Sequence, residues 1–361
     1  MRLLSRYYNL KFYIGAIPLS NLIIAGIEHP FVRAFGKGSG GRIVSVNWNI
    51  TNRCNQHCYM CHSFEYIKSA GNEMSFEKVK KFLEDNRKNF STILFTGGEP
   101  FLREDIYDII DVAKANRLSC GVCTNGTLLD PEKTERIKKL DFIIFSIHGP
   151  KDIHDEITGK RGNFDATLGN IERFLSVNPG TKTMINCSIT EKNFDRLDGL
   201  VNIAERFRVP LRYEHLNYMN PDNISACGEE WKARMKDMPA CKVVTYSALP
   251  DIGPSGVDRI YKSMRRILAD HRTVSFKPNL DRADLEKWYS DRDIGRACHY
   301  AWNSLQITPA GDVLPCHFLD VRMGNINETP LLEIWNSDRY KKFRRELKKG
   351  IFIGCRHCCK L

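Results

Sequence analysis

Residues 42–61 read RIVSVNWNITNRCNQHCYMC, a strand-like run (42–49) that leads directly into three cysteines. Cys54, Cys58 and Cys61 follow the spacing C-x3-C-x2-C. Three thiolates on one loop can hold three irons of a cubane cluster and leave the fourth iron open for a substrate or cofactor. Zinc is the alternative, with His57 or His62 as the fourth ligand, but structural zinc sites favour paired C-x2-C knuckles.

Strands and helices alternate on the C-terminal side of this loop. Six strands are predicted, at 42–49, 91–96, 119–124, 142–147, 183–190 and 211–216. Helices are predicted between them at 75–89, 105–116, 131–140, 165–177 and 194–207. This order predicts an α/β fold, a partial (β/α)6 TIM-like barrel with a small cysteine-rich C-terminal domain. No Gly-rich dinucleotide fingerprint follows any strand, and in a βα barrel the chemistry lies at the C-terminal strand ends.

Three of those strand ends carry distinctive motifs. The second strand ends in TGGEP (96–100), the third in CTNGTLL (123–129), and the fourth reads FIIFSIHGP (142–150) before a stretch containing KRGNF (160–164). Together with the cysteine loop, these stretches resemble the radical S-adenosylmethionine (SAM) superfamily, whose signature is C-x3-C-x-Φ-C. The resemblance implies one [4Fe-4S] cluster that binds and reductively cleaves SAM, producing a 5′-deoxyadenosyl radical that takes hydrogen from a substrate.

The resemblance also assigns cofactor contacts by position. These are Met60, Gly97, Gly98, Glu99, Pro100, Asn125, Ser146 and Arg161. Met60 takes the apolar Φ position, whereas Ser146 and Arg161 are expected near the ribose and carboxylate of SAM. His148 departs from the family pattern, because many members carry Asp there. It either alters ribose or substrate contacts or is an ordinary loop histidine.

The C-terminal segment supplies a second cysteine set. Cys298 and Cys316 flank a predicted hairpin that turns at Pro309–Asp312, and Cys355 and Cys358 form a C-x2-C after a basic helix. Four thiolates make a closed site for one cluster, with zinc as the alternative. The spacing resembles the SPASM/Twitch domain of radical SAM enzymes, and with five cysteines it resembles the shorter Twitch form. That form implies one auxiliary cluster, of the [4Fe-4S] type, with Cys359 as a substitute ligand or a spare.

The remaining cysteines are interpreted as packing residues. Cys120 and Cys123 point to opposite faces of a strand and so do not share a metal, and Cys187 lies in another strand. Cys227 and Cys241 are interpreted as ordinary thiols, although they could face substrate or pair with Cys359. Thirteen cysteines in 361 residues, without a secretory signal, indicate metal or redox chemistry rather than a disulfide framework.

Charge and the N-terminal arm bear on partners. The net charge of +11 suits an anionic partner without selecting one. The apolar run Phe12–Ile27, interrupted by Pro18 and Asn21, is too short for a span, but basic neighbours suit an interfacial helix pair. The predicted divisions are a basic and apolar arm (1–41), the barrel (42–217), an irregular helical connection (218–297) with candidate helices near 228–238, 256–270 and 281–290, and the auxiliary-cluster domain (298–361).

These patterns predict a radical SAM enzyme, cytoplasmic or peripheral at the inner membrane face, reduced by a protein such as flavodoxin or ferredoxin. The arm favours a lipid or another membrane-associated substrate, and peptide maturation is the alternative. A non-catalytic zinc or iron–sulfur scaffold is the alternative of another class. Nucleic acid is disfavoured, because Lys341–Lys349 reads as a solvated helix face. No general base or hydrogen donor can be assigned, and substrate-contacting residues are expected within 212–297.

Overall fold

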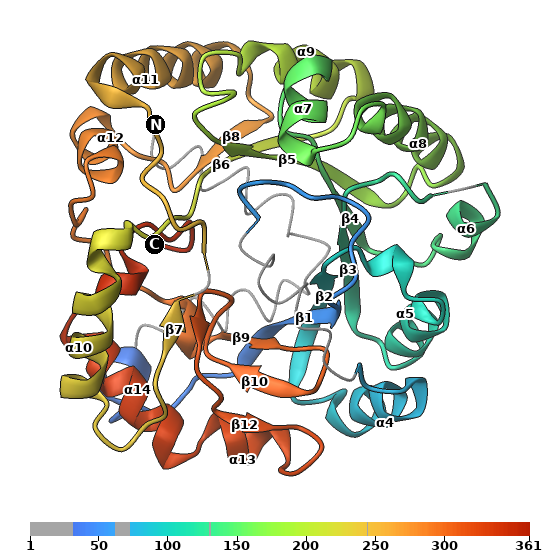
Figure 1. The fold of residues 1–361 in the computed structure, drawn as a ribbon. Helices are drawn as coiled ribbons and strands as arrows, with labels where there is room; N and C mark the ends of the chain where they lie inside the picture. Colours follow the sequence, from blue (N-terminus) through green and yellow to red (C-terminus); the bar gives the residue numbers. More distant parts are fainter. Residues whose placement is uncertain (1–31, 62–72, 130, 244) are drawn as a thin grey trace.

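The computed structural model describes residues 32–61, 73–129, 131–243 and 245–361. A curved ten-stranded sheet forms its centre, in the order β12-β10-β9-β1-β2-β3-β4-β5-β6-β8. The helices pack on its outer face (Figure 1). The parallel strands of the barrel are β1 (Ile43–Thr51), β2 (Phe90–Gly97), β3 (Ser119–Thr124), β4 (Phe142–Ser146), β5 (Lys182–Ile189), β6 (Leu211–His215) and β8 (Val274–Lys277). The predicted partial barrel is therefore confirmed.

The helices that cover the barrel match most of the predicted ones. They are α4 (Phe76–Asn86), α5 (Ile106–Ala115), α6 (Pro131–Arg136), α7 (Lys151–Thr158), α8 (Asn163–Val177), α9 (Asp198–Phe207), α11 (Gly253–Asp270) and α12 (Arg282–Tyr289), whereas α10 (Ile224–Arg234) packs on the C-terminal segment through Trp231. Helix α7 occupies a stretch predicted as a loop. It begins after Pro150 and ends at Gly159, whose φ of 71° closes the helix in the left-handed conformation that glycine tolerates.

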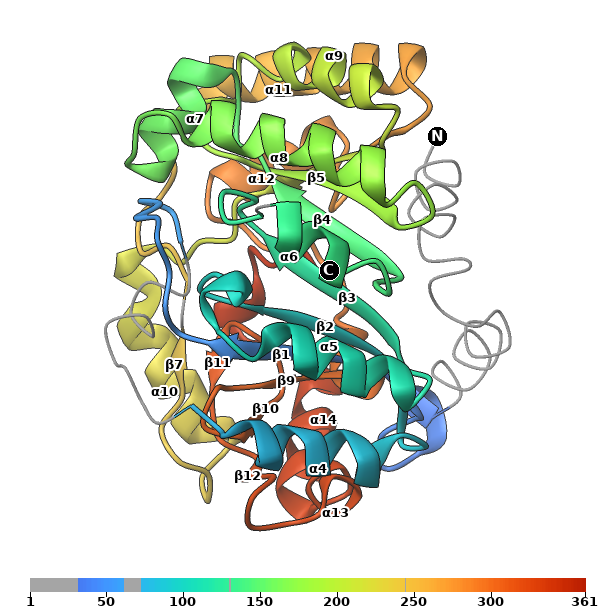
Figure 2. The same cartoon turned by 90° about the vertical axis from the view of Figure 1, so that its right-hand side faces the viewer.

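The C-terminal segment continues the barrel sheet. Strand β9 (Ser304–Ile307) pairs in parallel with β1 and antiparallel with β10 (Asp312–Leu314), which gives the predicted hairpin. Strand β12 (Gly324–Asn325) pairs with β10, and β11 (Leu319–Asp320) pairs with β7 (Lys242–Val243). Helices α13 (Leu331–Trp335) and α14 (Asp338–Lys349) pack below this extension (Figure 2). The cysteine-rich segment is thus built onto the edge of the barrel.

Side-chain alternation divides each barrel strand between the core and the lumen. On β6, Leu211 and Tyr213 belong to the large core cluster under the outer helices, so Arg212 and Glu214 point the other way, into the lumen. Phe142, Ile144 and Met184 form a separate small cluster with Leu94 and Cys123 on the lumen side. The lumen therefore has an apolar part, with polar residues closer to the C-terminal strand ends.

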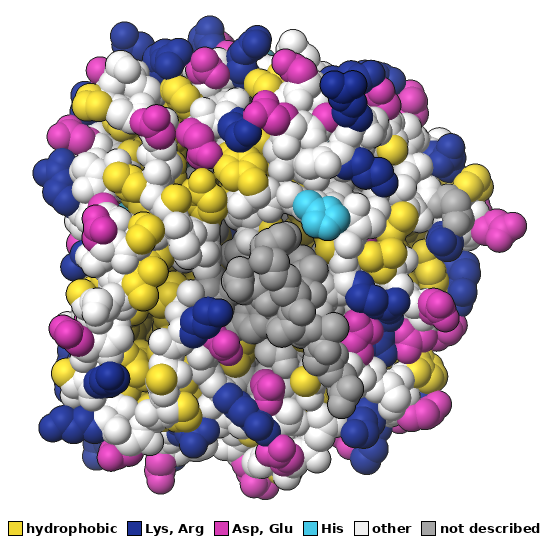
Figure 3. All heavy atoms as spheres, viewed as in Figure 1, with side chains coloured by type: hydrophobic (Ala, Val, Ile, Leu, Met, Phe, Trp, Pro, Cys, Tyr) yellow, Lys and Arg dark blue, Asp and Glu magenta, His cyan; other side chains and the backbone are white. Residues whose placement is uncertain are grey.

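The N-terminal arm lies mostly outside the described residues. The predicted interfacial run Phe12–Ile27 lies outside the described residues. His62, a ligand in the zinc alternative, also lies outside them. Among the helices that the structure describes, none combines the length and the apolarity needed to cross a membrane. On the face shown in Figure 3, basic and acidic side chains are interspersed around the rim.

Candidate functional site

The cysteine loop (residues 52–61) follows β1 and is attached to the end of β2. The N–H of Gly98 donates to the carbonyl of Thr51 at 2.9 Å, and the N–H of Glu99 donates to the carbonyl of Arg53 at 2.7 Å. A Cβ on Gly97 would lie 2.2 Å from the Thr51 oxygen, and one on Gly98 would lie 2.0 Å from the Arg53 oxygen. Both glycines are needed because the two backbones approach too closely for any side chain.

The Glu99 side chain joins the ends of β2 and β3, and the Asn125 side chain connects them to the cysteine loop. The buried Glu99 carboxylate accepts hydrogen bonds from the N–H groups of Asn125 (2.8 Å) and Phe101 (3.1 Å) and from the Thr124 hydroxyl (2.8 Å). Burial raises the pKa of Glu99 to about 7. The Asn125 amide donates to the Asn55 side chain at 2.8 Å. These side chains are therefore occupied in joining β2, β3 and the loop.

The other flank of the loop rests on α7. The N–H of Tyr59 donates to the carbonyl of Ile157 at 3.3 Å, and that of His57 donates to Thr158 at 3.2 Å. Met60 is buried in a small cluster with Ile157. The side chain of Met60 thus anchors the loop, and Pro100 begins a short 3-10 helix on the opposite flank.

The three loop thiols lie near one another. Burial raises the pKa of Cys54 to about 11, and nearby Glu99 and Cys61 add to the rise. The pKa of Cys58 is also raised, by burial and by the adjacent Cys61 and Cys54. Such thiols ionise readily only when a metal compensates the charge. This is the donor set that a cluster requires.

The C-terminal cysteines form a second group. Burial raises the pKa of Cys316 to about 12, with Cys298 adding to the rise. The pKa values of Cys355 and Cys358 are raised by burial and then by neighbouring cysteines, including Cys316 and Cys298. The N–H of Lys360 donates to the Cys358 sulfur at 3.4 Å. Four buried, neighbouring thiols with an N–H···S contact at Cys358 fit an iron–sulfur cluster, whose potential such contacts tune.

Neither group converges on one point. Within the described ranges, no three His, Cys, Asp or Glu side chains are close enough to bind a single metal ion. A cubane cluster ligates each thiolate to a different iron, so its ligands surround the cluster instead of meeting.

The other cysteines divide between core and site. Cys120 and Cys187 are buried in the main core, as interpreted from the sequence. Cys123 faces the lumen, where burial raises its pKa to about 11. Cys241 lies close enough to Cys227 and Cys316 for their charges to raise its pKa further, after burial. Cys241 is brought to the auxiliary cysteines by the pairing of β7 with β11.

Ser146, Arg161 and His148 occupy different surroundings. Ser146 ends β4 and is hydrogen-bonded to Cys123 in the lumen. Arg161 is exposed in the turn between α7 and α8. His148 is buried; its Nδ1 accepts the N–H of Ser188 at 3.3 Å, and burial lowers its pKa to about 3, with His154 contributing. His148 is therefore a neutral imidazole with its proton on Nε2.

A charged cluster in the lumen was not identified from the sequence. Arg212 and Glu214 on β6 face Asn186 on β5 and Lys277 on β8. The Arg212 Nε donates to the Asn186 Oδ1 at 2.8 Å and lies 3.2 Å from the Glu214 Oε1. The spacing of Arg212 and Glu214 could have predicted this cluster, because residues two apart in a strand lie on the same face.

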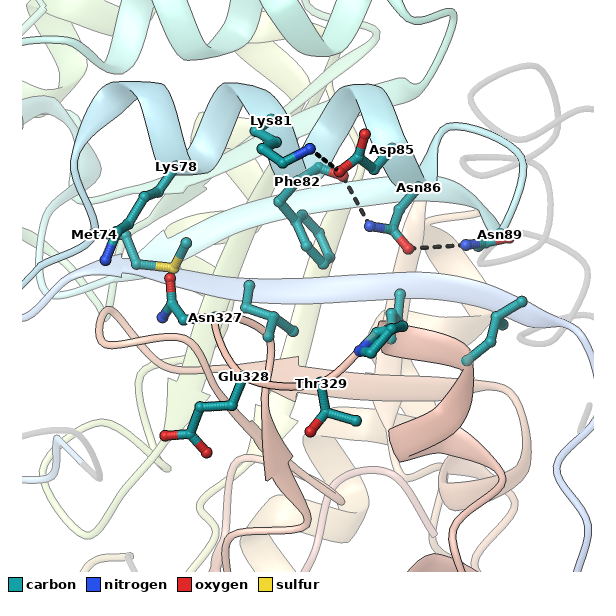
Figure 4. A pocket seen from close by; sticks show the side chains of 14 residues that line it. Met74, Lys78, Lys81, Phe82, Asp85, Asn86, Asn89, Asn327, Glu328 and Thr329 are labelled. Carbon is teal, nitrogen blue, oxygen red and sulfur yellow. Dashed lines mark hydrogen bonds and ion pairs between the residues drawn. The ribbon is translucent and has the colours of Figure 1, made fainter.

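A pocket on the outside of the barrel, shown in Figure 4, lies away from both cysteine groups and from the charged cluster. It is a groove of about 560 Å³ between α4 and residues 326–332. Its wall carries an ion pair between Lys81 and Asp85 at 2.8 Å and amide contacts of Asn86 and Asn89. None of the predicted ligand or cofactor residues lines it. The groove is an outer seam between α4 and the C-terminal segment.

Comparison with known proteins agrees with the two cysteine groups. Residues 48–198 match the radical SAM superfamily model, and residues 298–359 match the SPASM iron–sulfur cluster-binding domain. The chain is 25% identical over 314 residues to an AdoMet-dependent heme synthase of Nitratidesulfovibrio vulgaris, covering 83% of this chain and 81% of that protein. It is 28% identical over 177 residues to the mycofactocin maturase MftC of Mycolicibacterium smegmatis, covering 48% of this chain and 44% of that protein.

The fold is similar to that of SuiB of Streptococcus suis. The TM-score is 0.63 at 16% identity, covering 86% of this chain and 69% of that chain. At that identity the likeness concerns the fold, including the attachment of a C-terminal segment to a partial barrel.

Proposed function

The chain belongs to the radical SAM superfamily and carries a SPASM iron–sulfur domain, and from this premise we propose that it oxidises a tetrapyrrole bearing carboxylate side chains. It is an enzyme that uses a [4Fe-4S] cluster, SAM and auxiliary iron–sulfur chemistry. The alternative of a non-catalytic scaffold is set aside on that ground. The observation that carries the substrate proposal is the cationic cluster in the lumen.

We assign the SAM-cleaving cluster to Cys54, Cys58 and Cys61. When bound, cluster and SAM supply the radical that removes hydrogen from the substrate. The contribution of the chain is positional: Gly98, Glu99 and α7 hold the cysteine loop at the C-terminal strand ends, beside the lumen. We propose that Gly97, Gly98 and Pro100 contact the cofactor through their backbone carbonyl groups. The N–H groups of Gly98 and Glu99 already donate hydrogen bonds to the carbonyls of Thr51 and Arg53.

We assign the auxiliary cluster to Cys298, Cys316, Cys355 and Cys358. Their burial and proximity support this ligand set, and Cys359 stays outside it as a spare thiol. The N–H of Cys359 donates to Asn217 at 2.5 Å, which fixes the tail against the segment after β6. A buried auxiliary cluster beside the lumen suits a reaction in which the substrate loses a second electron.

Two features favour a tetrapyrrole. The heme synthase relative aligns over most of both chains, 83% of this chain and 81% of that protein. The lumen charges suit a substrate with carboxylate groups, which tetrapyrroles of the heme type carry. Peptide maturation is the second candidate, favoured by the mycofactocin maturase, but that alignment covers only 48% of this chain.

Fewer observations support the other predicted partners, which are a lipid substrate, a reductant protein and a membrane surface. The lipid expectation depended on residues 1–31, which lie outside the described ranges, and none of the relatives named above carries a lipid in its name. A flavodoxin-like or ferredoxin-like reductant remains a prediction, as does a peripheral membrane position.

The test begins with iron, sulfide and zinc content after anaerobic reconstitution, together with 5′-deoxyadenosine formation under dithionite. Wild type should contain about eight irons, and a Cys54/Cys58/Cys61→Ala triple variant about four, with loss of SAM cleavage. Incubation with Fe-coproporphyrin III and SAM should then yield an altered porphyrin. Zinc in the variant and wild type alike, with no SAM cleavage, would contradict the assignment. Turnover of a precursor peptide in place of the porphyrin would favour the second candidate.

A further inference from the structure

The lumen holds more positive than negative charge. Among the described residues, Arg212, Lys277 and Lys360 all lie near the Glu214 carboxylate. The exposed fractions of the Arg212, Glu214 and Lys277 side chains are 8%, 16% and 28%. Within the described part of the chain, Arg212 and Lys277 thus share one carboxylate in a confined space, and such cations are costly without a full counterion.

The network around Glu214 leaves the lysines weakly paired. The Asn186 amide and Arg212 both approach the Glu214 carboxylate, at 3.4 Å and 3.2 Å, whereas the Lys277 Nζ stays 3.9 Å away. Burial would raise the pKa of Glu214, but Arg212, Lys277 and Lys360 outweigh it and lower the pKa to about 2. The carboxylate is therefore ionised and already shared among the cations.

Lys360 arrives from the auxiliary-cluster side. It follows Cys358 and Cys359 in the tail, and its Nζ lies 5.9 Å from the centre of the Tyr300 ring. The pKa of Lys277 is lowered by burial and then by repulsion from Lys360, so the two ammonium groups are neighbours. His357 anchors the tail, since its ring stacks on Tyr218 at 4.0 Å between centroids. The tail thus completes a cationic group that begins on β6 and β8.

We propose that Arg212, Lys277 and Lys360 form a binding site for a carboxylate of the substrate, built jointly by the barrel and the C-terminal tail. This inference rests on the proposed function and assigns its specificity to particular residues. An incoming carboxylate would offset the positive excess and receive charge-assisted hydrogen bonds, which are roughly twice as strong as neutral ones. Glu214 holds Arg212 and Lys277 in place and repels a carboxylate that enters too far.

Binding can be measured without turnover. The probe is coproporphyrin III as the free acid, compared with its fully methyl-esterified form, in equilibrium dialysis against the reconstituted holoenzyme. Wild type should bind the acid in clear preference to the ester. Lys277→Gln and Lys360→Gln should each weaken acid binding about 10- to 100-fold, since a hydrogen bond to a charged group is lost. Ester binding should change little. Lys139→Gln, an exposed residue before β4, is the matched control and should bind like wild type.

The outcomes separate the inference from the proposed function. Equal binding of acid and ester by wild type would overturn the inference and leave a tetrapyrrole substrate standing. Binding of neither probe would overturn the tetrapyrrole proposal and the inference with it. A third outcome concerns SAM, which also has a carboxylate. If Lys277→Gln loses SAM affinity by the same factor, the site serves the cofactor and the inference fails.

Discussion

Gly98→Ala tests whether the second strand end positions the cysteine loop. The added Cβ would lie 2.0 Å from the Arg53 oxygen and 2.9 Å from the Asn52 oxygen, whereas ordinary contact begins at 3.4 Å. Both neighbours are backbone atoms, so no side-chain rotation relieves the overlap. The loop and the end of β2 must separate by about 1.4 Å, the difference between 3.4 and 2.0 Å.

That separation has two calculable effects. It breaks the hydrogen bonds from Gly98 to Thr51 and from Glu99 to Arg53, each worth about 1 kcal/mol, and strained packing adds about 1–3 kcal/mol. The free energy of unfolding should fall by about 3–5 kcal/mol. A catalytic group displaced by about 1 Å can lose about 100-fold in rate, so SAM cleavage should fall by that order.

The assays are a denaturant titration, iron content after reconstitution, and 5′-deoxyadenosine formation with excess dithionite and SAM. Gly169→Ala is the matched control, because Gly169 lies inside α8 with nothing within 4 Å of an added Cβ. This control should be neutral or more stable by about 0.5–1 kcal/mol. A Gly98→Ala protein with wild-type stability, iron content and cleavage rate would refute the claim that this contact places the loop.

Three further predictions concern other parts of the molecule. Because burial lowers the pKa of His148 to about 3, only the unfolded chain takes up its proton as pH falls below about 6.5. Wild type should therefore lose about 2 kcal/mol more stability than His148→Asn between pH 6.5 and pH 5, measured by urea titration; equal losses would contradict the neutral imidazole. Cys355→Ala should lose about four irons while Cys359→Ala keeps them, and the reverse pattern would exchange their roles. Arg344 is buried, donates to the carbonyls of Ala301 and Trp335 at 2.8 Å each, and lies 4.0 Å from the Trp335 ring centre. Arg344→Ala should lower the free energy of unfolding by about 3–5 kcal/mol and Arg344→Lys by less, as followed by denaturant titration; no loss would show that its hydrogen bonds are replaced by water.

Local pattern predicted the barrel well because its strands and helices follow one another along the chain. β3 begins and ends where the sequence placed it, and the other predicted strands differ by a few residues at their ends. Helix α7 was missed although Pro150 and Gly159 mark its two ends. The prediction gave more weight to the loop motif than to the capping residues Pro150 and Gly159.

Long-range pairing was outside the reach of such patterns. The pairing of Ser45 with Ser304 joins segments separated by most of the chain, and no local signal specifies it. Strand β8 is four residues long and follows α11 in a region where no strand was predicted, so its place beside β6 depends on the barrel itself. The sequence could therefore indicate a cysteine-rich C-terminal segment but not its continuity with the barrel sheet.

Sequence patterns indicate the candidate cluster ligands more directly than the residues that support them. Cysteine spacing is chemically specific, so both cysteine groups were identified from the sequence. Glu99 and Asn125 stay predicted cofactor contacts; in the structure the Glu99 carboxylate accepts the Asn125 N–H, and the Asn125 amide donates to Asn55 of the cysteine loop. Arg212 and Lys277 lie within residues 212–297, where substrate contacts were expected, yet their convergence depends on the register of β6 and β8. Cysteine motifs indicate candidate iron ligands, whereas the pairing register of β6 and β8 determines which charged side chains lie together.

The barrel strands and the C-terminal tail both contribute charged residues to the lumen. This affects the interpretation of variants that lose the auxiliary cluster. Lys360 is two residues from Cys358, and its N–H contacts that sulfur. Loss of the auxiliary cluster would remove the attachment of Cys358 and shift the neighbouring Lys360 ammonium group relative to Glu214. A cysteine variant with reduced turnover therefore combines two effects, impaired electron transfer and weakened substrate binding. Only when its affinity for the free-acid porphyrin equals that of wild type can the loss be attributed to electron transfer.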